Sequence, residues 1–186
     1  VADIPASGTG LGSSSSFTVG LLNALHAYKG RLASAATLAR ESCHIELDRC
    51  GEPIGKQDQY IAACGGLTCF TFNPDDSVDV VPLRVSMDTR FDLEDNLLLF
   101  FTGFSRSAGS ILKDQNTRTK SSDKEMIENL HFVKQLGLKS KELLESGKTT
   151  AFGELMHEHW EHKKRRSGGM SNPQIDEWYN LGIANL

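Results

Sequence analysis

The first sixty or so residues place apolar side chains at the spacing of helices. Apolar residues recur every three or four positions in segment 13–29, which predicts a helix that ends at Gly30. The same spacing predicts a second helix over residues 34–48 and a short third helix over residues 56–64. The chain therefore opens with helices, and the first follows a loop rich in glycine and serine.

The pattern then changes from helical spacing to alternation. The segments "GGLTCFTFN" and "VDVVPLRVS" alternate or run apolar on either side of "PDDS", which predicts a β-hairpin with a polar turn. The charged stretch "DTRFDLEDN" follows, and the apolar "LLLFFTG" after it predicts a buried strand by its length and phenylalanine content. This change of character indicates a domain boundary near Thr89.

Helical signals return in the second half, where we expect two or three helices. Ser122 and Glu125 form the S-x-x-E pattern in which each side chain satisfies a free backbone N–H at a helix start. Asn172 and Pro173 suit the cap and the first position of a later helix. Helices mixed with strands predict an α+β fold with domains at residues 1–89 and 90–186.

Composition and charge limit the kinds of binding partner that we expect for the protein. The 186 residues are 39% hydrophobic, enough for a core, and 20 basic against 24 acidic residues give a net charge of −4. Without a basic surplus we expect no nucleic-acid partner. No apolar stretch approaches the roughly 20 residues that span a bilayer, so we expect no membrane partner. The chain starts with Val and stops within an apolar helical pattern, which suggests an internal fragment.

The cysteines indicate a reducing compartment. The chain has four cysteines, with no C-x-x-C pair and no dense framework. Reduced thiols are therefore expected rather than disulfides or a zinc site, which favours the cytoplasm. These residues are Cys43, Cys50, Cys64 and Cys69.

The segment "SGTGLGSSSSF" is the first candidate for chemistry. The first N–H groups of a helix lack intrahelical partners and carry the positive end of the helix dipole, so an anion binds there readily. Alternating glycines let the backbone approach a phosphate, and the hydroxyls of Ser13 and Ser14 suit a phosphate or its Mg²⁺. The alternative is a flexible loop with a capping serine. Neither G-x-x-x-x-G-K-[ST] nor G-x-G-x-x-G is present, so spacing alone leaves the type of loop open.

Three segments resemble a known family. "PASGTGLGSSSSFTVGLLNAL" resembles the second motif, P-x-x-x-G-L-G-S-S, of the GHMP kinase superfamily. "GEPIGKQDQYIAACGG" resembles its catalytic-aspartate segment, and "HEHWEHKKRRSGGMSNPQIDEWY" is similar to the branch that phosphorylates D-glycero-D-manno-heptose 7-phosphate. The resemblance implies a two-domain fold, with a ribosomal protein S5 domain 2-like N-terminal part and a ferredoxin-like C-terminal part, both incomplete here. The family's upstream motif and its third, glycine-rich motif are absent, in keeping with a fragment.

The resemblance also implies roles for individual residues. Asp58 matches the catalytic aspartate, although an aspartate in a first helical turn is also common for reasons of the helix dipole. Glu46 and Ser14 correspond to the Mg²⁺ ligands, with Glu41 as the alternative carboxylate. The residues expected to bind the ATP phosphates are Gly8, Gly10, Leu11, Gly12, Ser13, Ser14 and Ser15.

Three further features concern metal and phosphate. "MHEHWEH" places histidine and glutamate at i, i+4, but position 161 is Glu where H-E-x-x-H needs His, which favours a charged helical face over zinc. Arg106, in "TGFSRSAG", is our candidate for binding a substrate phosphate, with a surface arginine as the alternative. The basic run at residues 163–166 suits a helix end and is the reserve phosphate contact.

The expected function is an ATP- and Mg²⁺-dependent kinase. The resemblance implies transfer of the γ-phosphate to the anomeric hydroxyl of D-glycero-α-D-manno-heptose 7-phosphate, with ATP and the sugar phosphate as partners. A related fucose or galactose kinase is the alternative within the enzyme class. A non-catalytic regulator that binds nucleotide or sugar with the same fold is the alternative outside it.

Overall fold

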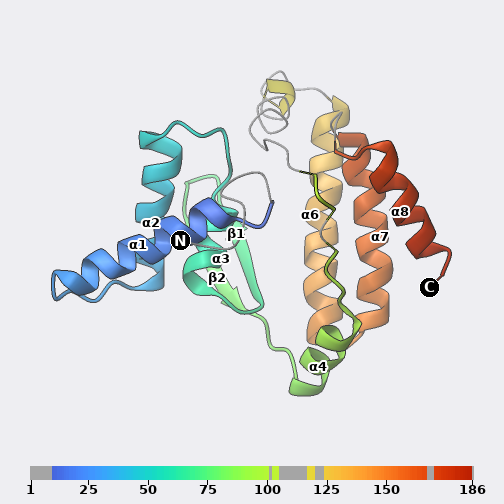
Figure 1. Ribbon diagram of the computed structural model, residues 1–186, viewed down its shortest axis with the longest axis horizontal. Helices are drawn as coiled ribbons and strands as arrows, with labels where there is room; N and C mark the ends of the chain where they lie inside the picture. The colour runs from blue at the N-terminus through green and yellow to red at the C-terminus, as the bar shows by residue number, and fades with distance from the viewer. Residues whose placement is uncertain (1–9, 101, 105–116, 120–123, 167–169, 186) are drawn as a thin grey trace. The chain divides into compact units, whose positions relative to one another are not determined.

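The computed structural model describes residues 10–100, 102–104, 117–119, 124–166 and 170–185 (Figure 1). These residues form two compact units. The first unit contains residues 10–83 and Phe104, and the second contains residues 84–100, 102–103 and the described residues from 117 onward. Each unit is described here by itself.

The first unit opens with helix α1, Ser13–Tyr28, which confirms the helix predicted behind the glycine and serine loop. Its end is set by Gly30, whose φ of 66° lies in the left-handed region that glycine adopts without strain. The N–H of Arg31 donates to the carbonyl of His26, and the N–H of Gly30 donates to that of Ala27, both at 2.9 Å. This pair of bonds is the Schellman motif, so the helix ends where the sequence predicts.

The next two helices are α2, Ala35–Cys43, and α3, Gln57–Cys64. Ser34 begins α2 by accepting the N–H of Thr37 on its hydroxyl at 3.1 Å. The segment predicted as a single helix over residues 34–48 consists of two parts, because α2 continues into a π-helical segment, η1, His44–Arg49. A π turn carries an extra residue, which the apolar spacing does not reveal.

The predicted hairpin is confirmed. Strands β1, Thr68–Phe72, and β2, Val78–Pro82, pair antiparallel, with Phe72 opposite Val78 at the turn end. Asp76 completes the turn with a φ of 72°, a conformation that aspartate tolerates better than most residues.

The hydrophobic core of the first unit lies where α2, α3 and the hairpin meet. Ala39, Cys43 and Tyr60 are buried there. The ring of Tyr60 meets Phe70 and Phe72 edge-on, with centroids 6.0 and 6.2 Å apart. Aromatic packing thus holds α3, which carries Asp58 in its first turn, against the sheet.

The apolar stripe that predicts α1 is not the face that α1 buries in the first unit. Phe17, Leu21, Leu25 and Tyr28 are 68, 47, 48 and 89% exposed. The buried residues of α1 are Ser15 and Val19, on the side that faces α2 and α3.

The second unit is helical in the part that the structure describes. Its long helices are α6, Lys124–Glu145, and α7, Thr149–Arg166, which lie side by side, followed by α8, Pro173–Ile183 (Figure 1). Asn172 caps α8 by accepting the N–H of Ile175 at 2.9 Å, as predicted. The helices expected in the second half are therefore present.

Two segments around residue 90 differ from what the sequence predicts. The charged stretch forms a helix that we did not predict, α4, Met87–Asn96, with Ser86 as its cap. The buried strand expected in "LLLFFTG" is wrong for residues 97–100, which have no regular structure and are 52 to 86% exposed. A strand needs a neighbouring strand to pair with, whatever the hydrophobicity of its residues. The described part of the second unit contains no strand.

Two other predictions for this half of the chain remain predictions. The compact units divide between Leu83 and Arg84, while Thr89 lies inside α4, and domains at residues 1–89 and 90–186 stay a prediction. Ser122, half of the predicted capping box, lies outside the described residues.

Candidate active site

The glycine and serine loop forms the N-terminal end of α1. Gly10 and Gly12 have φ values of 71° and 66°, which turn the backbone into the helix. Gly12 caps α1, and its carbonyl accepts the N–H of Ser16 at 3.0 Å. Ser13, Ser14 and Ser15 make up the first turn, so their N–H groups are those that an α-helix leaves without an intrahelical partner. Of the predicted phosphate-binding residues, Gly8 alone lies outside the described part of the chain.

Asp58 lies against this loop. It occupies the first turn of α3 and is exposed. A Cβ atom added at Gly12 would lie 3.5 Å from the Cγ of Asp58, so the carboxylate is in van der Waals reach of the backbone that starts α1. The structure therefore brings together the predicted phosphate loop and the predicted catalytic carboxylate, which are more than forty residues apart in sequence.

Glu46 is buried beside the same helix end, only 6% exposed. The π-helical segment η1 directs it toward α1 and α3. The hydroxyl of Ser15 donates to its Oε2 at 2.7 Å, and the side-chain amide of Gln59 donates to the same oxygen. The hydroxyl of Thr18 lies 3.4 Å from Oε1. A buried carboxylate is stable only with such donors.

The serine that contacts Glu46 is not the one we expected beside it. Ser15 makes the hydrogen bond, whereas Ser14 is exposed and its backbone carbonyl accepts the hydroxyl of Thr18 at 2.9 Å. The assignment of Ser14 and Glu46 as a metal-binding pair stays a prediction. The contact of Ser15 was missed because residues 13–16 are all serine, and their sequence does not show which of them faces α3.

The alternative carboxylate, Glu41, has a different partner. Its carboxylate oxygen lies 2.8 Å from Nε2 of His26, near the C-terminal end of α1. His26 is eleven residues beyond Ser15, which is roughly 16 Å along a helix axis. Glu41 is thus tied to the opposite end of α1 from the phosphate loop, which favours Glu46.

Gln59 is a residue of this site that we did not predict. It is fully buried, and its Oε1 has no hydrogen-bond partner among the described residues. Its position next to Asp58 was the one signal in the sequence.

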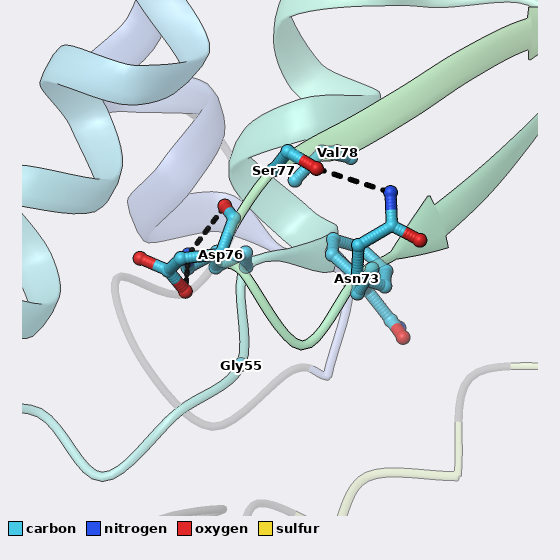
Figure 2. A pocket seen from close by; sticks show the side chains of 8 residues that line it. Gly55, Asn73, Asp76, Ser77 and Val78 are labelled. Atoms are coloured by element: carbon cyan, nitrogen blue, oxygen red, sulfur yellow. Dashed lines mark hydrogen bonds and ion pairs between the residues drawn. The ribbon is translucent and has the colours of Figure 1, made fainter.

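A pocket lies between the loop before α3 and the turn of the hairpin (Figure 2). Its volume is about 350 Å³. Lys56 forms an ion pair with the carboxylate of Asp76, and the amide of Asn73 donates to the hydroxyl of Ser77 at 3.1 Å (Figure 2). The lining residues are Gly55, Lys56, Gln57, Phe72, Asn73, Asp76, Ser77 and Val78.

The remaining candidates lie in the second half of the chain. Arg106 falls outside the described residues. In the histidine-rich segment of α7, Nδ1 of His157 lies 2.8 Å from the hydroxyl of Tyr179, and Lys164 pairs with Glu161 at 2.7 Å. Among the described residues no three histidine, cysteine or acidic side chains gather as a metal site would need, and no helix is long and apolar enough to cross a bilayer.

Comparison with known proteins finds a family match over the segment that contains the loop. Residues 1–66, which contain the glycine and serine loop, Glu46 and Asp58, match the family model of the GHMP kinases N terminal domain. In this segment the chain is similar to the GHMP kinases N terminal domain. A D-glycero-alpha-D-manno-heptose 7-phosphate kinase of Campylobacter jejuni is 32% identical over 183 residues, which are 98% of this chain and 53% of that protein.

Another relative and two solved structures are also similar to this chain. A bifunctional fucokinase/GDP-fucose pyrophosphorylase of Arabidopsis thaliana is 27% identical over 97% of this chain and 17% of that protein. A solved D-glycero-D-manno-heptose 1-phosphate kinase of Bacteroides thetaiotaomicron has a TM-score of 0.69 at 30% identity, over 88% of this chain and 46% of that one. A solved Campylobacter jejuni protein described as a sugar kinase has a TM-score of 0.72 at 31% identity, over 98% and 51%. The chain spans about half the length of its heptose-kinase relative.

Proposed function

We propose that this chain is the part of an ATP-dependent sugar kinase that holds the nucleotide phosphates and the catalytic carboxylate. The observation that carries the proposal is the position of Asp58 against Gly12, at the N-terminal end of α1. A phosphate bound at that end would lie close to a carboxylate able to accept a proton. The GHMP kinase family model supports it, because it spans both residues.

Phosphoryl transfer needs little covalent chemistry from a protein. It needs the γ-phosphate held, its charge neutralised and the attacking hydroxyl oriented. We assign the first task to the N–H groups and hydroxyls of the loop from Gly8 to Ser15. Asp58 would orient the acceptor hydroxyl of the sugar and take its proton as the new oxygen–phosphorus bond forms and the bond from the γ-phosphorus to the ADP leaving group breaks.

Magnesium fits the oxygen donors near the loop. Oε2 of Glu46 accepts two hydrogen bonds, while Oε1 has the long contact with Thr18, so Oε1 keeps acceptor capacity. Mg²⁺ prefers carboxylate, hydroxyl and phosphate oxygens and takes few of them from protein. We therefore propose Glu46 and the hydroxyl of Ser14 as the protein ligands. Mg²⁺ bound there would neutralise charge on the β- and γ-phosphates.

For the acceptor we propose a heptose phosphate. The relatives named as heptose kinases support this class, but one is named for the 7-phosphate and the other for the 1-phosphate. Our specific proposal is transfer to the anomeric hydroxyl of D-glycero-α-D-manno-heptose 7-phosphate, with Arg106 binding the 7-phosphate and the reaction taking place in the cytoplasm. A fucose-type kinase is the second candidate, favoured by the match to the fucokinase protein.

The substrate proposal is tested on the intact protein that contains this chain. We expect kcat/KM to be highest for heptose 7-phosphate among phosphorylated and free heptose, mannose, fucose and galactose. Arg106→Ala should lower kcat/KM for heptose 7-phosphate by about 10- to 150-fold, the effect of losing one charge-assisted contact, and leave any use of free heptose unchanged. Efficient use of free fucose with none of heptose 7-phosphate would refute the substrate and keep the kinase.

A separate variant distinguishes a kinase from a binding protein. Asp58→Asn keeps the shape of the side chain and removes its basicity, so we expect nucleotide affinity to stay unchanged and kcat to fall by about 10²- to 10⁴-fold. Calorimetry with ADP and a coupled assay of sugar phosphorylation measure the two effects. Wild-type turnover by this variant would show that Asp58 is not the catalytic residue.

A further inference from the structure

The carboxylate of Glu46 is held by donors from two helices. Ser15, in the first turn of α1, and Gln59, in the first turn of α3, both donate to Oε2. Ser15, Glu46 and Gln59 are 1, 6 and 0% exposed, so water does not compete for these bonds. The other oxygen, Oε1, is turned toward α1, where Thr18 lies 3.4 Å away. The donors thus decide which oxygen of Glu46 keeps acceptor capacity.

Gln59 makes this bond at a cost in its own hydrogen bonding. A carboxylate only accepts hydrogen bonds, so the amide must present its NH₂ group to Glu46. Its Oε1 is then buried with no partner among the described residues. An unpaired buried acceptor is unfavourable, and packing alone would be satisfied by an apolar side chain of the same size. A buried polar side chain with an unpaired acceptor needs an explanation, and the hydrogen bond that Gln59 donates to Glu46 supplies one.

The backbone around Glu46 is also specialised. Glu46 lies in η1, where the N–H of Cys50 donates to the carbonyl of Ile45, five residues back, at 2.9 Å. Such π-helical turns occur often at functional sites, because the extra residue redirects a side chain. The π-helical backbone and the side-chain hydrogen bonds therefore both orient the carboxylate of Glu46.

We propose that Gln59 is a positioning residue that fixes Oε2 of Glu46, so that Oε1 remains available on the α1 side for the metal of a bound metal–nucleotide complex. Since Gln59 follows Asp58 directly in α3, the same helical turn positions the metal-binding and the catalytic carboxylates. This inference rests on the proposed function, and in particular on Glu46 as a metal ligand.

The test compares nucleotide binding with and without metal in the intact protein. Calorimetry with ADP in Mg²⁺ and in EDTA gives the gain in affinity that Mg²⁺ supplies. Gln59→Met keeps the size of the side chain and removes the donor, so we expect the gain to fall by about 10- to 100-fold, while the affinity in EDTA stays unchanged. Gln59→Asn, whose amide is one methylene shorter and cannot reach Glu46, should behave in the same way and serves if the Met variant fails to fold.

Two further variants separate positioning from general stability. Leu38→Ala opens a cavity at a buried position of α2 and should lower the melting temperature without changing the Mg²⁺-dependent gain. Glu46→Gln should abolish most of the gain by itself. If Gln59 acts through Glu46, Gln59→Met should then have little further effect in the Glu46→Gln background.

The outcomes distinguish this inference from the proposed function. A normal gain in Gln59→Met, together with a lost gain in Glu46→Gln, overturns the inference and leaves the metal site standing. Equal losses in Gln59→Met and Leu38→Ala also overturn it, because destabilisation would explain both. A normal gain in Glu46→Gln removes Glu46 as a metal ligand, and the role of Gln59 falls with it.

Discussion

Asp58 lies against one of the two glycines of the facing loop. Gly10 and Gly12 both have positive φ values, so a side chain at either position strains the backbone by about 1 kcal/mol or more. They differ in their surroundings, because a Cβ at Gly12 meets Asp58 at 3.5 Å and one at Gly10 meets nothing within 4 Å. The two positions therefore separate backbone strain from contact with the carboxylate.

We expect Gly10→Val and Gly12→Val both to weaken nucleotide binding in the intact protein by at least about tenfold, and Gly12→Val to lower kcat as well. Both variants place a β-branched side chain at a positive φ, but only the side chain at Gly12 also contacts Asp58, the proposed catalytic carboxylate. Calorimetry with ADP and a coupled assay of sugar phosphorylation measure the two effects, and Gly20→Ala, in open space on α1, is the control that should bind normally. Equal affinities for wild type and Gly12→Val would mean that the loop only caps the helix.

Cys43 offers a test of burial at one atom. Burial raises the pKa of its thiol to about 11, from an ordinary value near 9. Since the thiolate is the reactive form, at pH 8 only about one in a thousand of these thiols is ionised. We expect Cys43 to react with a thiol reagent at least about a hundredfold more slowly than the exposed Cys50, as followed by peptide mass spectrometry. Similar rates would contradict the burial.

The same shift has a consequence for stability. The folded protein keeps the Cys43 proton at a higher pH than the unfolded chain does, because its pKa is raised in the folded state. This contribution to the free energy of unfolding is therefore present below about pH 9 and is lost as the pH rises toward 11. Denaturant titrations of wild type and Cys43→Ala should show a smaller loss in the variant over this range.

At the scale of helices, local residues at the ends explain where the elements begin and stop. Gly30 ends α1, Ser34 begins α2 and Asn172 begins α8, each through a hydrogen bond of 2.9 to 3.1 Å that a backbone N–H donates to a backbone carbonyl at Gly30 and to a side-chain oxygen at Ser34 and Asn172. These bonds form between residues three to five positions apart, so they depend little on the rest of the fold. The interior of an element is less local, as the change from α2 to η1 shows.

We expect Ser34→Ala to lower the free energy of unfolding by about 1 kcal/mol, because the N–H of Thr37 loses its acceptor. Urea denaturation followed by circular dichroism measures the change. Ser34→Asp keeps an acceptor at the cap and should lie within about 0.5 kcal/mol of wild type. A loss of the same size in both variants would contradict a capping role.

The net charge of the chain predicts how strongly it binds polyanions such as DNA. With a net charge of −4, the chain has no basic surplus to displace counterions from a phosphate backbone. The pairing of Lys164 with Glu161 removes part of the positive character of its basic run. A bound nucleotide would therefore be held by a local site rather than by the overall field of the protein.

We expect no saturable binding of double- or single-stranded DNA below about 10 µM protein at physiological salt, measured by fluorescence anisotropy. The control is a fluorescent ADP, which the intact protein should bind in the same buffer. Micromolar DNA binding that weakens steeply with added salt would contradict this expectation.

The local structure and the resemblance to the GHMP kinases could be predicted from the sequence alone. The helical spacing of residues 13–29, the turn chemistry of the hairpin and the caps at Gly30 and Asn172 depend on neighbours along the chain, and the structure has them as predicted. The resemblance to the GHMP kinases could be recognised because the glycine and serine loop follows the fixed residue order of their second motif, and residues 1–66 match that family model. Such features need no knowledge of what packs against them.

Which of the candidate side chains contact one another depends on the tertiary structure. It turns Ser15 rather than Ser14 toward Glu46, brings in Gln59, ties Glu41 to His26 and leaves residues 97–100 without a partner strand. Hydrophobic spacing marks a possible buried face, but burial and hydrogen bonding depend on elements distant in sequence. The loop and Asp58 come together because α1 and α3 pack against each other, a contact that no periodicity along the chain encodes.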